Sequence, residues 1–268
     1  MATVERSKEI QLVRDYVRNA KREFDGLALY TRRFDMYPFD MMGLGILSKA
    51  FSLANAIFVL LGAGLEDQAY GLCRSIVECS LNLRYLTEDR SQLWARTDKY
   101  MRFAVADKQY WMHWALQSAA GTPMEAKILE YGKQWGLTPD TKGASKHWSG
   151  EKGFAWVTNL KDHPLDGDSS TDFIKKSQYA VDYYQTSSYI HCYSTALDNF
   201  WPEERAQFSI EERSKQPQFQ KVLFMVLGYV HSSIAYTIFG LGMERPQVFN
   251  ELYSETLQSM APYERRFS

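Results

Sequence analysis

Hydrophobic residues recur at intervals of three and four along most of the chain, the spacing that places side chains on one face of an α-helix. In the first such stretch Ile10, Val13 and Val17 are apolar, and charged residues stand between them. The stretch 40–62 is apolar on nearly all sides and predicts a central helix, and the stretch 217–241 predicts a final apolar helix. No strong strand pattern occurs. The predicted helices cover residues 4–35, 40–62, 66–88, 90–119, 123–135, 172–198, 217–241 and 246–260.

These elements predict an all-α protein, a single multi-helix bundle over residues 1–268. Its parts are an N-terminal helix within 1–38, a loose, loop-rich insertion over 136–171 and a central, polar-striped helix over 172–198. The insertion is rich in Gly, Pro, Ser, Thr, Asp and Lys, so a lid, a docking loop and a plain long connection all remain open for it.

Charge and cysteine content narrow the classes of protein. Lys and Arg number 31 against 32 Asp and Glu, and this net charge of -1 gives no global field that attracts nucleic acid or acidic membrane. The three cysteines lack zinc-ligand spacing and predict reduced core residues in a cytoplasmic protein. No apolar signal segment opens the sequence. The apolar stretches 44–65 and 222–243 carry polar residues without a clear basic flank, so we expect core helices and no membrane contact.

The stretch 172–198 carries an unusual polar face. Tyr184, Ser187 and His191 fall on one helical stripe together with further hydroxyl residues and a carboxylate. Such a face lacks the Lys and Glu of a solvent-exposed surface and predicts a polar pocket or a buried hydrogen-bond network. His191 is therefore a candidate general acid or base, while a satisfied core histidine is the structural alternative.

A second unusual face lies on the helix predicted over 66–88. Arg74 and Glu78 stand one turn apart and predict an ion pair, with Tyr85 on the same side and Asp107 among the aromatic residues of the next helix. An exposed pair of little energetic value is the simple interpretation. The other is that the carboxylate holds the arginine as an anion or phosphate site, to which Tyr85 and Asp107 would contribute.

His231 follows Gly228 by three residues, and this small residue would allow another helix to approach closely. His231 is thus a further binding candidate that could meet the face of His191, and a helix-contact histidine is the alternative. Searches for nucleotide-binding, hydrolase and helical metal-site motifs find none, so we predict neither a metal nor another cofactor.

Four short motifs carry a family resemblance. They are Cys73-Arg74-Ser75-Ile76-Val77-Glu78, Leu83-Arg84-Tyr85-Leu86, His147-Trp148-Ser149-Gly150 and Tyr184-x-x-Ser187-x-x-x-His191. Together they resemble a bacterial all-α family without an assigned activity, domain of unknown function 5677, over roughly residues 45–240.

That family is in turn distantly similar to the HEPN superfamily of helical domains. This resemblance implies a dimeric, metal-independent ribonuclease of the kind found in toxin and phage-defence systems, with a motif of Arg, four to six residues and His. Only the histidine carries over, as His191, because the corresponding arginine positions hold Tyr184, Gln185 and Thr186. Arg74 is our candidate for the missing arginine.

Two functions therefore remain open from the sequence. In the first, a HEPN-like bacterial effector acts on RNA as an endoribonuclease, is a homodimer and is restrained by an inhibitory protein partner. His191, Arg74 and Glu78 would be catalytic, and Tyr184 and Ser187 would position the imidazole. In the second, a non-catalytic helical module binds a small anionic ligand, a nucleotide or a partner protein. The sequence does not identify the substrate or the pathway.

Overall fold

A computed structural model describes residues 2–30, 38–134, 136–137, 163–165, 182, 186 and 219–264. These residues form α-helices and no strand, which confirms the all-α prediction. Six of the predicted helices appear with bounds within a few residues of those expected, and the first is helical up to residue 30, beyond which residues 31–37 are not described. The elements are α1 (Ala2–Tyr30), α2 (Pro38–Gly62), α3 (Glu66–Thr87), a 3-10 turn η1 (Arg90–Gln92), α4 (Leu93–Ala119), α5 (Pro123–Gln134), α9 (Phe219–Gly240) and α10 (Val248–Glu264).

The chain divides into two compact units. One comprises Met1–Arg90 and Lys161–Ser268, and the other comprises Ser91–Leu160. That residues 1–268 form one domain stays a prediction. Most of the predicted insertion 136–171 and of the predicted helix 172–198 lies outside the described residues.

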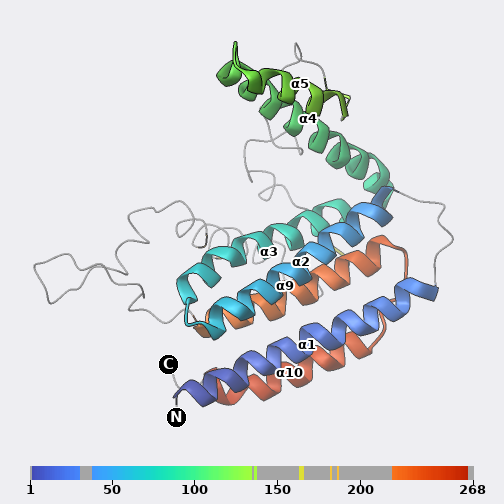
Figure 1. Cartoon of the computed structure of the whole chain (residues 1–268). Helices are drawn as coiled ribbons and strands as arrows, with labels where there is room; N and C mark the ends of the chain where they lie inside the picture. The colour runs from blue at the N-terminus through green and yellow to red at the C-terminus, as the bar shows by residue number, and fades with distance from the viewer. Residues whose placement is uncertain are drawn as a thin grey trace, which may run out of the picture. The chain divides into compact units, whose positions relative to one another are not determined.

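Helix α9 is the centre of the larger unit. Figure 1 shows α9 behind α2 and beside α3, with the α1 and α10 pair on its other side. The side chains that meet along α9 give the helix directions: Tyr70 and Thr87 of α3 lie near the start and end of α9, so these two helices run parallel. Ser233 and Thr237 donate to backbone carbonyls one turn earlier in α9, so their hydroxyls are satisfied inside the apolar core.

The ends of α2 and α9 pack closely because residue 240 is glycine. A Cβ atom at Gly240 would lie 2.2 Å from a ring carbon of Phe39 and 2.8 Å from Thr87. The other end of α2 closes at Gly64, whose φ of 73° suits glycine and places the Leu65 amide 2.9 Å from the Leu60 carbonyl. The predicted stop at Gly62-Ala-Gly64 is confirmed.

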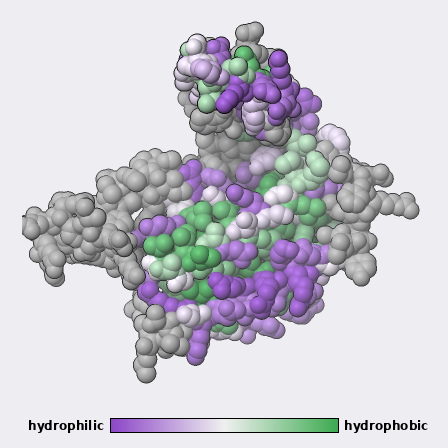
Figure 2. Space-filling model, in the orientation of Figure 1, coloured by the Kyte–Doolittle hydropathy of each residue, from purple (hydrophilic) through white to green (hydrophobic). Residues whose placement is uncertain are grey.

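Helices α1 and α3 differ in how completely they are buried. The predicted stripe of α1 is buried, including Ile10, Val13 and Val17, while charged side chains cover its outer face, the hydrophilic band of Figure 2. For α3 we expected one buried stripe facing the core and a polar opposite side. The opposite side is also largely buried, with Tyr70 only 1% exposed.

By length and composition alone, α2 and α9 are apolar enough to cross a membrane. Core helices pass the same test, and 50% and 72% of the two apolar windows are buried inside the protein. These helices are therefore weak evidence for a membrane span.

The smaller unit is an antiparallel hairpin of α4 and α5. Gly132 of α5 lets the helices approach, because a Cβ there would lie 2.5 Å from the sulfur of Met112. The sequence Gly121-Thr122-Pro123 predicts that Thr122 caps α5, but the Thr122 hydroxyl donates to the Ala119 carbonyl at 2.7 Å. Glu125 instead caps the turn by accepting from the Gly121 amide at 2.8 Å.

Candidate functional site

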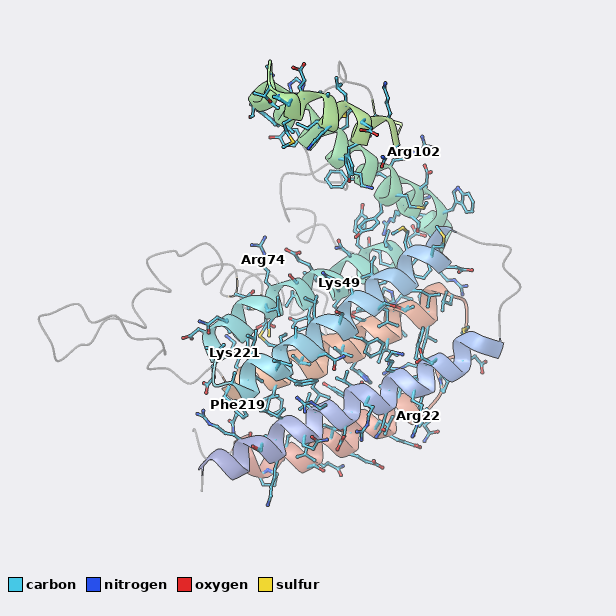
Figure 3. The ribbon with its side chains drawn as sticks, viewed as in Figure 1. Arg22, Lys49, Arg74, Arg102, Phe219 and Lys221 are labelled. Carbon is cyan, nitrogen blue, oxygen red and sulfur yellow. The ribbon has the colours of Figure 1, made fainter. Side chains whose placement is uncertain are left out.

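Arg74 and Glu78 form the predicted ion pair on α3. The Nε atom of Arg74 donates to Oε1 of Glu78 at 3.0 Å, and the two side chains are 20% and 32% exposed. The pair thus lies at the edge of the bundle, neither in full solvent nor in the core. Figure 3 shows Arg74 projecting from the N-terminal half of α3. A guanidinium whose Nε is held by a carboxylate has a defined plane, which favours recognition of an oxyanion.

A second cation, Lys221 of α9, contacts α3 at Tyr70, one helical turn before Arg74. Its Nζ donates to the hydroxyl of Tyr70 at 2.7 Å and lies 4.8 Å from the centre of the same ring. Tyr70 precedes Arg74 by four residues, so both cations belong to one end of α3. Burial lowers the pKa of Lys221, and the nearby carboxylate of Asp182 opposes this shift.

Asp182 belongs to the stretch 172–198 and contacts the middle of α9. The hydroxyl of Tyr229 on α9 donates to its carboxylate at 2.5 Å. Burial raises the pKa of Asp182, while the Tyr229 hydrogen bond and Lys221 oppose the rise. Burial also raises the pKa of the Cys73 thiol, and Asp182 adds to that rise. Asp182 thus adds a negative charge to the surroundings of Lys221 and Cys73.

The remaining predicted residues of this site lie outside the part of the chain that the structure describes. They are His191, Tyr184 and Ser187. Tyr85 is half-buried on α3. Asp107 lies on α4 in the other unit, and its side chain is also outside the described residues. The assembly of Arg74, Glu78 and His191 into one site therefore stays a prediction.

His231 lies in a separate cluster between α1, α9 and α10. Arg245 donates through Nη2 to its Nε2, and burial followed by the charge of Arg245 lowers the pKa of His231 to about 3. Because a guanidinium only donates, the neutral ring carries its proton on Nδ1, which donates to the Tyr16 oxygen at 2.8 Å. Tyr253 stacks on the ring at 3.9 Å. The expected contact of His231 with His191 stays a prediction.

A third polar cluster, which the motif search missed, is buried at the C-terminal end of α3. Arg84 and Glu88 have side-chain exposures of 0% and 1%, with Nη1 and Oε2 3.7 Å apart. Nearby, the Leu165 amide donates to Nδ1 of His163 at 3.1 Å, so the proton of a neutral ring is on Nε2 and points to Thr87. Burial, and secondly Arg84, lowers the pKa of His163 to about 4.

Sequence spacing could have suggested one of these missed groups. Arg84 and Glu88 have the same one-turn spacing as Arg74 and Glu78, but apolar neighbours such as Leu83 and Leu86 indicate burial. Lys221 gave only a weak signal, a single charge near the start of an apolar helix. Arg245 gave no sequence signal, because only the tertiary fold brings it to His231 and Tyr16.

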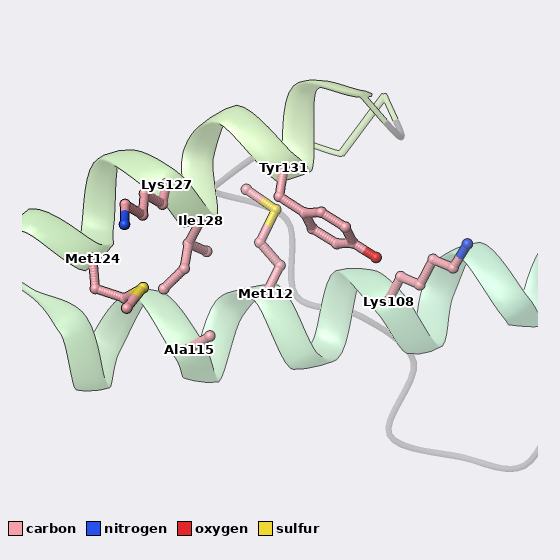
Figure 4. A pocket seen from close by; sticks show the side chains of 7 residues that line it. All are labelled: Lys108, Met112, Ala115, Met124, Lys127, Ile128 and Tyr131. Atoms are coloured by element: carbon pink, nitrogen blue, oxygen red, sulfur yellow. The ribbon is translucent and has the colours of Figure 1, made fainter.

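The α4–α5 hairpin carries an apolar groove of about 480 Å³ (Figure 4). Methionine, isoleucine, alanine and tyrosine side chains line it, and Figure 4 shows Lys108 and Lys127 toward its two ends. Within the described residues, no group of three or more His, Cys, Asp or Glu side chains could hold a metal ion.

These features define an all-α protein whose central helices carry ionisable side chains in separate, partly buried clusters. The cluster near the N-terminal end of α3 contains two cations, Arg74 and Lys221. The profile of a family of unknown function, DUF5677, matches residues 40–208. The chain belongs to this family, as its motifs predicted. Neither a curated protein nor a solved structure matched the chain. Arg74, Glu78 and His191 fall inside the matched stretch, and Tyr16, His231 and Arg245 fall outside it.

Proposed function

We propose that this protein is a HEPN-like bacterial effector that cleaves RNA without a metal ion, as a cytoplasmic homodimer in a toxin or phage-defence system. One observation supports the shared site in particular. Asp182 lies only nine residues before His191 and bonds to Tyr229 of α9. Burial raises the pKa of the Cys73 thiol, next to Arg74 in sequence, and Asp182 adds to that rise. Asp182, from the same predicted helix as His191, thus contacts α9, the helix that packs against α3.

In this proposal the reaction is an attack by a ribose 2'-hydroxyl on the adjacent phosphorus. His191 takes the 2'-hydroxyl proton, the new P–O bond forms, and the bond from phosphorus to the 5'-oxygen breaks as that oxygen gains a proton. Arg74 stabilises the negative charge on the phosphate oxygens, and Glu78 orients Arg74. Tyr184 and Ser187 position His191. The products are a 2',3'-cyclic phosphate and a free 5'-hydroxyl.

The proposal predicts that purified full-length protein cleaves RNA in the presence of EDTA. Arg74→Ala and His191→Ala should each lower the cleavage rate by at least about a hundredfold, the usual contribution of a positioned acid–base group or charge. Arg18→Ala is the matched control, because Arg18 also pairs with a carboxylate on its own helix but is 69% exposed. Cleavage followed on a labelled oligoribonucleotide decides the matter, and full activity in both variants would refute the mechanism.

A second candidate is a non-catalytic module that binds a small anionic ligand or a partner protein. It is favoured by the missing superfamily arginine, since Tyr184, Gln185 and Thr186 occupy the expected positions. It predicts that an RNA oligonucleotide or a nucleotide binds the wild type without being cut, and that Arg74→Ala weakens this binding. An inhibitory partner belongs to the first candidate and would be recovered as a stable complex that suppresses cleavage.

A further inference from the structure

The cluster around His231 joins four segments of the chain into one polar site. Tyr16 comes from α1, His231 from α9, Arg245 from the connection after α9 and Tyr253 from α10. His231 lies ten residues after Lys221, which is about 15 Å along the helix. His231 forms a hydrogen bond with α1 and a stacking contact with α10, and neither contact involves α3. The cluster is therefore separate from the proposed RNA site.

Arg245 is partly buried, and it differs from the arginines of this unit that form ion pairs with glutamate. Arg6, Arg74 and Arg84 each lie within 4 Å of a glutamate oxygen. Among the described residues no carboxylate is that close to Arg245, whose Nη2 donates to Nε2 of the neutral His231 ring. Burial lowers its pKa, and only Tyr16 opposes that shift. A partly buried cation without a counter-charge is costly, and an anion would remove that cost.

Two hydrogen-bond donors of this cluster, one on Arg245 and one on Tyr16, are left without an acceptor among the described residues. The Nε atom of Arg245 is buried and has no acceptor. The hydroxyl oxygen of Tyr16 accepts from His231 Nδ1–H, so its own proton is left to donate. A positive charge with two donors and no acceptor suits a ligand that carries negative charge on several oxygens. His231 contacts both Arg245 and Tyr16 through its two ring nitrogens, and Tyr253 covers one face of its ring.

We propose that Arg245 and Tyr16 bind a phosphate group, either free or as the monoester of a nucleotide, on the side of α9 that faces α1 and α10. Arg245 supplies the charge and the Nε–H donor, and Tyr16 supplies the O–H donor. Neutral His231 positions both without contacting the reacting atoms of the RNA mechanism. Tyr16 and Arg245 lie outside the stretch 40–208 that defines the family, so the site belongs to the flanking helices of this chain.

The test is thermal unfolding of the full chain in sodium phosphate, adenosine monophosphate or adenosine, each compared with sodium chloride at equal ionic strength. Phosphate and adenosine monophosphate should raise the unfolding temperature of the wild type, because a ligand of the folded state stabilises it. Adenosine should not. Stabilisation by adenosine monophosphate alone would assign the site to nucleotides. The absence of any shift with both phosphates, or an equal shift with adenosine, would overturn the proposal.

Variants then locate the effect. Arg245→Gln and Tyr16→Phe should weaken phosphate binding, measured by titration calorimetry, by at least about tenfold each, the value of one lost charge-assisted hydrogen bond. Arg22→Gln is the control, since Arg22 lies on α1 with a 75% exposed side chain (Figure 3). If Arg245→Gln does not fold, Tyr16→Phe decides, because it keeps the ring against Tyr253. Unchanged affinity in Tyr16→Phe would overturn the site. RNA cleavage does not enter this readout.

Discussion

At the scale of single residues, three arginines with the same local spacing have different surroundings. Arg74, Arg84 and Arg102 each pair with a carboxylate one helical turn away. The exposed fractions of the three arginine side chains are 20%, 0% and 79%. The spacing predicts each pair, but burial decides its energy, because desolvation is paid only by the buried charges. Arg84 and Glu88 therefore depend on each other inside the core, whereas 20% of the Arg74 side chain is exposed at the surface.

We predict that Arg84→Met destabilises the protein by about 3–5 kcal/mol, because it removes the positive charge that lies beside the buried Glu88 carboxylate. The double variant Arg84→Met, Glu88→Leu should recover most of this loss, since both charges are then replaced by apolar side chains of similar volume. Urea unfolding measures both values.

The matched control for this prediction is Arg102→Met. Its pair with Asp98 has the same one-turn geometry, at 2.7 Å, on an exposed surface. No measurable change in the free energy of unfolding is expected there. A similar loss in Arg84→Met and Arg102→Met would contradict the assigned role of burial.

At the scale of elements, α9 organises the larger unit because each of its sides meets a different helix. Its polar residues mark these contacts: Lys221 bonds to α3, and His231 bonds to α1. Near its C-terminal end Gly240 allows Phe39 of α2 to pack directly on the backbone. An apolar helix of this kind derives its stability from packing, so a single added methyl group at a tight contact is costly.

Gly240→Ala should destabilise the protein by about 1–3 kcal/mol, because the new Cβ would overlap the Phe39 ring. Gly26→Ala is the control. Nothing lies within 4 Å of a Cβ at Gly26, within α1, so this change should stabilise the protein by about 0.5–1 kcal/mol through helix propensity. The two unfolding temperatures should move in opposite directions. A gain in both variants would show that α2 and α9 do not pack closely at residue 240.

The helices were predictable because hydrophobic periodicity and glycine stops are local signals, as at Gly64. Which helix is central was harder to predict. We expected 172–198 to organise the bundle, and among the described residues α9 is the helix that contacts α1, α2, α3 and α10. Lys221 was missed as a site residue because its partner Tyr70 is 151 residues distant in sequence, and Arg245 was missed because its partner His231 is 14 residues distant, on the helix before it. Such pairings depend on the tertiary arrangement, which periodicity does not encode.

At the scale of the whole molecule, two neutral histidines link folding to pH. His163 packs between Tyr236 and Phe239 of α9, and His231 lies in the phosphate-site cluster of the same helix. Burial lowers the pKa of both rings, to about 4 and about 3. The unfolded chain binds a proton near pH 6.5, where both folded rings are still neutral. Acid therefore favours the unfolded state, and the stability is present above pH 6.5 and lost as the pH falls toward 4.

We predict the size of this effect for His163, which is 4% exposed. Between pH 7.5 and pH 4 it should remove about 3 kcal/mol from the free energy of unfolding, given a pKa near 6.5 in the unfolded chain and about 4 in the folded protein. His163→Gln retains groups that can bond to Thr87 and Leu165 but does not titrate, so its loss over the same range should be smaller by that amount. Urea unfolding at several pH values measures both. Parallel curves for His163→Gln and the wild type would contradict the prediction, because they would mean that His163 binds its proton equally well in the folded protein and in the unfolded chain.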